Sequence, residues 1–231
     1  MIYVYALCDG PPPALTGTAG LEQQPLAALE ASPVAAVYSR HASASPHPTP
    51  DNAWCHEAVV EALGPDRAVL PVRFGTTFPD LDALGAVLRC HRRWLQAGLD
   101  RVRGCVELGV RVLWTAPAEP RDEEPAPGAA PGRAYLLARL AEQRRSEPAR
   151  ARAEHLHRQL AAVAAEYTRP GDRGGQLLSG AYLVPRGAVG AFRRRLDELG
   201  RADPQVRVLC TGPWPPYHFV PQIPLGEPMH A

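Results

Sequence analysis

The sequence contains no lysine, so all 25 of its basic residues are arginines. Acidic residues number 24, which brings the formal net charge to only +1. A chain this close to neutral has no global field that would attract nucleic acid or anionic lipid. The missing lysine also removes the residue with which a P-loop holds phosphates. We therefore expect neither nucleic acid nor a membrane as a partner.

Long apolar runs are missing as well. The longest runs, such as residues 160–165, are far too short to cross a bilayer. The first residues, Met1–Tyr5, have neither the basic region nor the long apolar stretch that marks a signal peptide. Together these absences predict a cytoplasmic protein.

Cysteines are few and dispersed, and no Cys-x-x-Cys pair occurs. Histidine and cysteine do not recur at the spacing of four convergent zinc ligands. None of the cysteines stands in a pattern typical of a catalytic nucleophile. We therefore predict no metal site, no cofactor and no catalytic residue, and we interpret the cysteines as reduced, small and mostly buried. They are Cys8, Cys55, Cys90, Cys105 and Cys210.

Strand and helix patterns alternate through the first half of the chain. Residues 1–8, 33–39 and 68–74 have the composition of strands, and a helix capped by Asp51 or Asn52 is expected to end near residue 63. Beyond Asp80, apolar residues recur at three- and four-residue spacing as far as Gly104, which predicts one long helix. Gly98 lies inside it and can bend it.

The second half begins with a clear strand at residues 105–114, in which apolar and polar residues alternate, so that one face is buried and the other wet. Residues 116–132 hold five prolines and an acidic cluster, which predicts a mobile loop. Helical pattern resumes at 133 and restarts near 146. Strands are then expected at 177–184 and 206–210, with a helix at 189–199 between them.

The order of elements predicts an α+β fold with two domains. Residues 1–103 would form an N-terminal α/β sandwich, and residues 104–220 a C-terminal ferredoxin-like sandwich with helices on one sheet face. The prolines after residue 212 predict an extended C-terminal segment, and residues 221–231 a tail.

Three segments carry a more specific signal: Val69–Phe78 (VLPVRFGTTF), Arg103–Val112 (RGCVELGVRV) and Thr211–Val220 (TGPWPPYHFV). In this order and spacing they resemble the gas vesicle protein F/L family, and the resemblance extends from Tyr3 to Val220. The resemblance implies two α+β domains and a non-enzymatic accessory or minor structural protein of gas vesicles. It also implies binding to the small, very apolar main shell protein and to other accessory proteins during assembly.

The first candidate contact site is the loop Arg73–Thr76, which follows one strand and precedes a helix. Gly75 can adopt a positive φ and turn the chain sharply. The guanidinium of Arg73 could hold a carboxylate or several carbonyls. Two interpretations stay open: Arg73 clamps its own loop while Phe74 fills the core, or Arg73, Phe74 and Thr76 present a contact surface.

The second candidate is the aromatic segment Trp214–Phe219. It could be strapped across its own domain, with Trp214 as the anchor. It could also present Trp214, Tyr217 and Phe219 as an exposed patch that docks on an apolar partner. The two interpretations are not exclusive.

Two other function classes remain as alternatives. A small-ligand-binding protein or enzyme could use an inter-domain cleft with Arg73 and Glu107 as its polar groups, although Glu107 and Arg111 look structural on the wet face of their strand. An RNA-binding module would need exposed aromatics on central strands beside basic residues, whereas these strands carry mostly Val, Leu and Ala.

Overall fold

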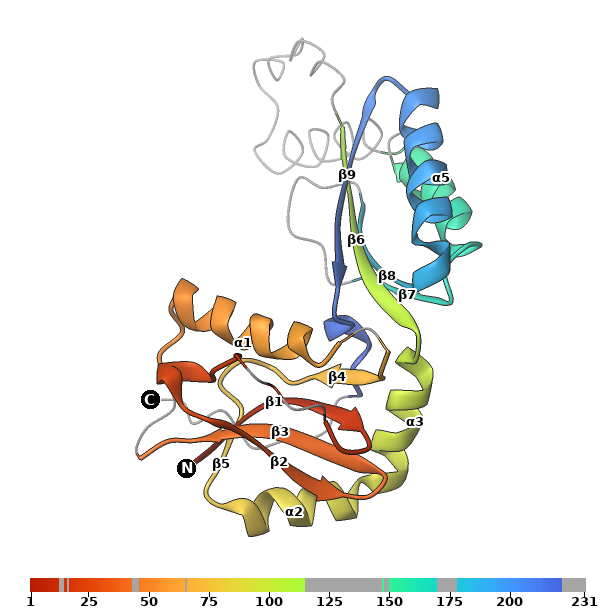
Figure 1. Ribbon diagram of the computed structural model, residues 1–231. Helices are drawn as coiled ribbons and strands as arrows, with labels where there is room; N and C mark the ends of the chain where they lie inside the picture. Colours follow the sequence, from red (N-terminus) through yellow and green to blue (C-terminus); the bar gives the residue numbers. More distant parts are fainter. Residues whose placement is uncertain are drawn as a thin grey trace, which may run out of the picture. The chain divides into compact units, whose positions relative to one another are not determined.

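The computed structural model describes residues 1–12, 15, 17–42, 46–64, 66–114, 147, 150–169 and 178–221. Its fold is mixed α/β with two antiparallel sheets. The chain divides into two compact units (Figure 1). The first comprises Met1–Glu107 and the segment that starts at Pro213, and the second is Leu108–Gly212. The loop expected at 116–132 and residues 222–231 of the expected tail lie outside the described residues.

The first unit is built on a five-stranded sheet with β1 (Ile2–Asp9) at its centre. β1 pairs antiparallel with three other strands, and its residues from Ile2 to Cys8 are all buried. An unbroken apolar run of this kind suits a strand whose two faces are both covered. The other strands are β2 (Leu26–Ala31), β3 (Val34–Arg40), β4 (Val69–Pro71) and β5 (Thr77–Phe78), and the order across the sheet is β2-β3-β1-β4, with β5 also paired to β1.

Helix α1 (Pro50–Ala62) covers one face of this sheet, and α2 (Leu81–Cys90) and α3 (Arg92–Val102) cover the other (Figure 1). α1 starts earlier than its sequence predicts. Thr49, rather than Asp51 or Asn52, is the N-cap, because its hydroxyl accepts the backbone N–H of Asn52 at 3.2 Å. Pro50 fits the first helical position, where its missing N–H has no partner to lose.

The single helix predicted from Asp80 to Gly104 is wrong, since the chain breaks at His91. His91 has φ −100° and ψ 11°, ends α2 and begins α3. The bend does not occur at Gly98, which lies inside α3. A Cβ at Gly98 would come within 2.6 Å of the Pro221 ring. This glycine is therefore explained by the close approach of the C-terminal segment to the helix.

The second unit has a four-stranded sheet in the order β7-β8-β6-β9, and the two helices among its described residues cover one face (Figure 1). The buried face predicted for β6 is confirmed, because Leu108, Val110 and Val112 join one core cluster with buried residues of both described helices. The wet face is confirmed at Arg111 but not at Glu107, which is buried. The elements are β6 (Cys105–Trp114), a helix at 150–161, β7 (Glu166–Thr168), β8 (Leu178–Pro185), α5 (Val189–Ala202) and β9 (Val206–Trp214).

The end of the described chain groups differently from the sequence-based division, which placed residues up to 220 in the second domain. β9 continues to Trp214, four residues beyond its predicted end, and a 3₁₀ turn η3 (Tyr217–Phe219) follows. From Pro213 onward the chain belongs to the first unit. The reason is that Phe219 is buried in the first unit and the Tyr217 hydroxyl donates a hydrogen bond to Glu57 of α1.

Replacing Gly98 by alanine should destabilise the protein, although alanine favours a helix over glycine by about 1 kcal/mol. The added methyl would push Pro221 away from α3. Gly85→Ala in α2 is the matched control, because its methyl would meet only the movable end of the Arg89 side chain. Urea unfolding of both variants checks this: a Gly98→Ala protein as stable as Gly85→Ala would contradict the packing seen here.

Candidate interaction surface

The loop Arg73–Thr76 is a tight turn closed by its own groups. Gly75 has φ +86°, a conformation that side chains rarely adopt. The Thr76 hydroxyl donates to the Arg73 carbonyl at 2.7 Å, and the Thr76 N–H donates to the same oxygen at 3.2 Å. Thr76 is buried, whereas the Arg73 side chain is exposed and forms no ion pair with any described residue. The loop is therefore closed by Thr76, and the Arg73 guanidinium does not take the clamping role that one of the two interpretations gave it.

Beneath this turn lies a cluster of rings that links it to α1. The Phe74 ring packs edge-on against Tyr3 and His56, with centroid separations of 5.9 and 5.7 Å. The Tyr3 hydroxyl accepts the Gly75 N–H at 3.2 Å and lies 2.9 Å from Nδ1 of His56. Nε2 of His56 lies 3.0 Å from the Val72 carbonyl oxygen. Since a carbonyl only accepts, Nε2 carries the hydrogen and Nδ1 accepts from Tyr3. Burial lowers the pKa of His56 to about 4, so the ring is neutral near pH 7.

A hydrogen-bonded relay that runs from the exposed Glu22 to the buried Ser39 fastens the short turn at residues 21–23 to the sheet. Glu22 Oε2 lies 3.1 Å from Nδ1 of His41, and Nε2 of His41 lies 2.8 Å from the Ser39 hydroxyl. This order resembles the acid–histidine–serine arrangement of hydrolases. However, Ser39 has no exposed surface and its oxygen is also bonded to the Tyr5 hydroxyl at 2.7 Å. The relay therefore has no access for a substrate and acts structurally.

The C-terminal segment from Pro215 to Pro221, here called the strap, is held on the first unit by polar and apolar contacts. The Tyr217 hydroxyl donates to Glu57 of α1 at 2.6 Å. Burial raises the pKa of both partners, and for Tyr217 the Glu57 carboxylate adds to the rise. Phe219 is 1% exposed, with the guanidinium carbon of Arg101 5.8 Å from its ring centroid.

Glu107 of β6 also holds the strap, through His218. One of its carboxylate oxygens accepts the backbone N–H of His218 at 2.9 Å, and the other lies 2.6 Å from Nδ1 of the same residue. Glu107 is itself buried. Both carboxylate oxygens are thus engaged by His218, so Glu107 fixes the strap through two hydrogen bonds.

The six sequence-predicted contact residues fall into two groups. Phe74, Thr76 and Phe219 are buried or packed on their own unit, and Tyr217 is half-buried on Glu57. Arg73 and Trp214 are the exposed members, with 38% of the Trp214 surface accessible. The turn and the strap meet at α1, because Phe74 contacts His56 and Tyr217 contacts the next residue, Glu57.

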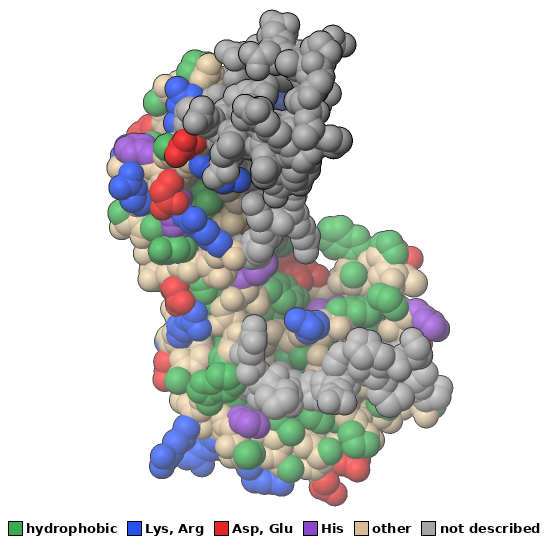
Figure 2. Space-filling view, turned by 180° about the vertical axis from the view of Figure 1, so that it is seen from behind, with side chains coloured by type: hydrophobic (Ala, Val, Ile, Leu, Met, Phe, Trp, Pro, Cys, Tyr) green, Lys and Arg blue, Asp and Glu red, His purple; other side chains and the backbone are tan. Residues whose placement is uncertain are grey.

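The sequence analysis missed the outer face of α1. Trp54 is 68% exposed, the exposed alanines Ala58 and Ala62 follow it at four-residue spacing, and the exposed carboxylates of Asp51 and Glu61 border this surface. Figure 2 shows hydrophobic side chains gathered over this helix. The inner face is also apolar, with Val59 and Val60 in the core. The signal that could have revealed the exposed apolar side chains is a tryptophan out of phase with the core stripe of the helix.

Neither a metal site nor a membrane span emerges from the described parts of the chain. Across those residues, no group of three or more His, Cys, Asp or Glu side chains converges closely enough to hold an ion. None of the helices built from them combines the length and the apolar character that crossing a bilayer requires.

Comparison with known proteins gives one consistent family. The model for "Gas vesicle synthesis protein GvpL/GvpF" matches residues 1–221. Gas vesicle protein L of Streptomyces sp. (strain CB03234) is 38% identical over 186 residues, which cover 73% of this chain and 68% of that protein. Gas vesicle protein F2 of Halobacterium salinarum is 32% identical over 190 residues, which cover 81% of this chain and 76% of that protein.

Two solved structures share the fold. The crystal structure of GvpF from Anabaena sp. PCC7120 superposes with a TM-score of 0.82 over 96% of both chains, at 19% identity. The crystal structure of GvpF from Microcystis aeruginosa superposes with a TM-score of 0.81 over 96% of this chain and 99% of that one, at 17% identity. At such identities the likeness speaks for the fold alone.

The depressed pKa of His56 makes stability depend on pH in a defined direction. Between its folded pKa of about 4 and the ordinary value of 6.5, the unfolded chain binds more protons than the folded one. The free energy of unfolding should therefore be highest above pH 6.5, and protonation of His56 should lower it by about 3 kcal/mol as the pH drops to 4. Urea unfolding across this range should show a shallower dependence for His56→Gln. An unchanged slope in that variant would contradict this role for His56.

The hydroxyl that holds the strap can be removed with little change of shape. Tyr217→Phe leaves Glu57 without its donor and should lower the free energy of unfolding by about 1–2 kcal/mol. Tyr38→Phe in the same unit is the control, because the Tyr38 hydroxyl makes no hydrogen bond to a described residue and its loss should cost less than about 0.5 kcal/mol. Equal losses in the two variants would mean that the strap hydrogen bond contributes nothing.

Proposed function

Since this chain belongs to the gas vesicle synthesis protein GvpL/GvpF family and takes part in gas vesicle formation, we propose that it acts as a non-enzymatic accessory protein that binds the apolar main shell protein during assembly. The observation that carries the proposal is the exposed apolar face of α1 around Trp54. Other accessory proteins of the vesicle would be further partners. The protein would act at the growing vesicle in the cytoplasm.

The physical logic starts from the partner. A shell subunit that will later face gas has to expose apolar surface before it is assembled, and such surface aggregates unless it is covered. A rigid helix that presents tryptophan and alanine side chains can cover it at small cost in side-chain entropy. α1 is held by its buried face, by the His56 cluster and by Tyr217 of the strap, so its outer face is preorganised.

The contact residues predicted from the sequence take different parts in this proposal. Arg73 and Trp214 are exposed and would touch partners directly. Phe74, Thr76 and Phe219 would act indirectly, by fixing the turn and the strap against the first unit. Tyr217 belongs to both groups, because its hydroxyl is bonded to Glu57 of α1 while part of its side chain stays accessible.

We further infer that the two compact units are two domains and that the second is ferredoxin-like. Its elements follow the order strand, helix, strand, strand, helix, strand, and its sheet has the order β7-β8-β6-β9 with both helices on one face. This topology is the one expected of a ferredoxin-like sandwich. The division that fits the contacts runs between Glu107 and Leu108, with the strap assigned to the first domain.

The proposal is tested by co-purifying the protein with the tagged main shell protein from a common host. Wild type should be captured stoichiometrically, and Trp54→Ser should reduce capture by more than about tenfold, as expected for a central aromatic contact. Trp94→Ser is the matched control: it removes another exposed tryptophan of the first unit and should leave capture within about twofold.

Trp214→Ala and Arg73→Ala, each checked by circular dichroism, show whether these exposed residues add to the surface. The proposal fails if wild type is not captured under conditions in which another accessory protein is. It also fails if the Trp54 and Trp94 variants lose capture equally.

A further inference from the structure

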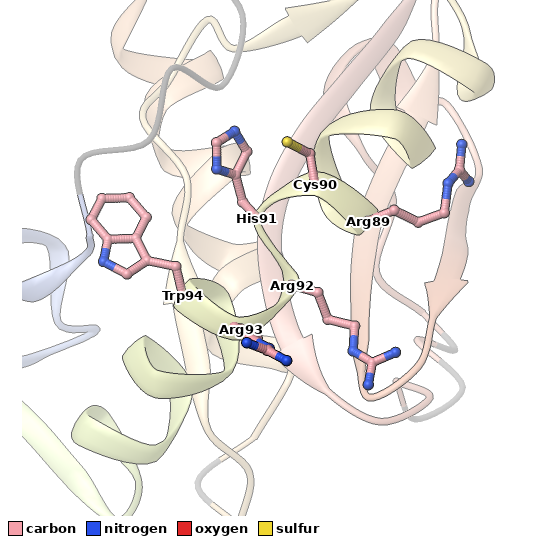
Figure 3. A pocket seen from close by; sticks show the side chains of 6 residues that line it. All are labelled: Arg89, Cys90, His91, Arg92, Arg93 and Trp94. Atoms are coloured by element: carbon pink, nitrogen blue, oxygen red, sulfur yellow. The ribbon is translucent and has the colours of Figure 1, made fainter.

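The break between α2 and α3 creates a second surface with a different chemistry. Six consecutive residues, 89–94, line a shallow hollow there. Figure 3 shows their side chains fanning out from the break, with Arg89 and Arg92 toward one side and His91 and Trp94 toward the other. We call the group formed by Arg89, Arg92, Arg93 and Trp94 the arginine patch.

The arginine patch carries positive charge that no described residue compensates. None of its three guanidinium groups forms an ion pair with a carboxylate of the described chain. The sequence of the patch contains no acidic residue. In addition, Arg92 and Arg93 occupy the first turn of α3, where the helix dipole disfavours cations and no side chain caps the helix. Cations that lack a counter-charge and lie where the helix dipole disfavours them are typical of a functional site.

An aromatic side chain completes the patch. Trp94 is 47% exposed, and the residue after it, Leu95, is fully buried and anchors α3 in the core. Arginine and tryptophan are the residues most often responsible for binding energy at protein interfaces. A planar guanidinium can hold a carboxylate with two hydrogen bonds, and the Trp94 indole, on the other side of the helix break (Figure 3), offers apolar area for a bulky side chain of the same partner.

We propose that the arginine patch binds an acidic segment of a partner protein, in which two or three carboxylates are flanked by a bulky apolar side chain. Charge complementarity selects the carboxylates, and Trp94 selects the apolar neighbour. The guanidinium groups of Arg89 and Arg92 extend to the same side of the helix break (Figure 3), so carboxylates of one acidic segment can reach both. A nucleic acid would instead require a longer basic track, since stable complexes neutralise about 6–10 phosphates. This surface is separate from the outer face of α1 and does not depend on shell-protein binding.

The test measures fluorescence anisotropy with a labelled synthetic peptide of about 15 residues that carries glutamate and leucine at helical spacing. Binding to wild type should be saturable at about 50 mM salt and weaken at higher salt, because screening shortens the reach of the charges. Arg92→Glu with Arg93→Glu should weaken it by at least about tenfold, and Trp94→Ser by about fivefold.

Arg194→Glu with Arg207→Glu is the matched control, because it makes the same change of net charge at two exposed arginines of the second unit. That control and Trp54→Ser should keep the affinity within about twofold. The proposal is overturned if the control pair loses as much as the patch pair, or if a glutamine version of the peptide binds equally well. It is also overturned if single-stranded DNA or phosphatidylserine vesicles bind the patch more tightly than the peptide, or if the peptide does not bind.

Discussion

Two tyrosine hydroxyls on the central strand β1 have to be hydrogen-bonded, because Tyr3 and Tyr5 are completely buried. A buried hydroxyl without a partner would cost about 1–3 kcal/mol. Tyr3 meets this demand with His56 and the Gly75 N–H, and thereby fixes α1 and the tight turn. Tyr5 meets it with Ser39 and the Leu21 N–H, and so fixes the turn at residues 21–23. The elements around the proposed shell-binding face are thus positioned from one strand.

The same constraint explains why the outer face of α1 can stay apolar without loosening the helix. Its inner face is tied to β1 through His56, and its flank to the strap through Glu57. The arginine patch is supported differently, by the buried leucines of α2 and α3 and by the break at His91. The first unit therefore presents two rigid surfaces of opposite chemistry, one apolar and one cationic.

Much of the fold could be predicted because its signal is local. Alternation in β6 gave its bounds correctly, and the apolar run of β1 gave a buried strand. The alanine-rich strand β2 was missed, because alanine has little strand preference and this strand owes its place to pairing with β3. The break at His91 was missed because the apolar stripe continues in phase across it.

The site was harder to predict, for a physical reason. The hydrogen bonds of the strap join Tyr217 to Glu57, which lies 160 positions earlier in the chain, and His218 to Glu107, which lies 111 positions earlier. The periodicity of a sequence carries no information on such distant pairs. Sequence reasoning could single out the aromatic segment, but not that Phe219 would be the buried anchor and Trp214 the exposed residue. For the same reason the sequence placed Glu107 on the wet face of its strand, whereas in the structure it is buried and bound to His218.

The strap also makes the first unit discontinuous, with Leu108–Gly212 inserted between its two parts. On the ribosome, residues 1–107 therefore emerge without Phe219 and Tyr217, which are translated more than a hundred residues later. At about 5–20 residues per second, the pocket that receives Phe219 stands open for about 5–20 s of synthesis. The inserted unit can fold in that interval, and the first unit closes last. Closure of the first unit therefore depends on a strap that is synthesised only after the whole inserted unit.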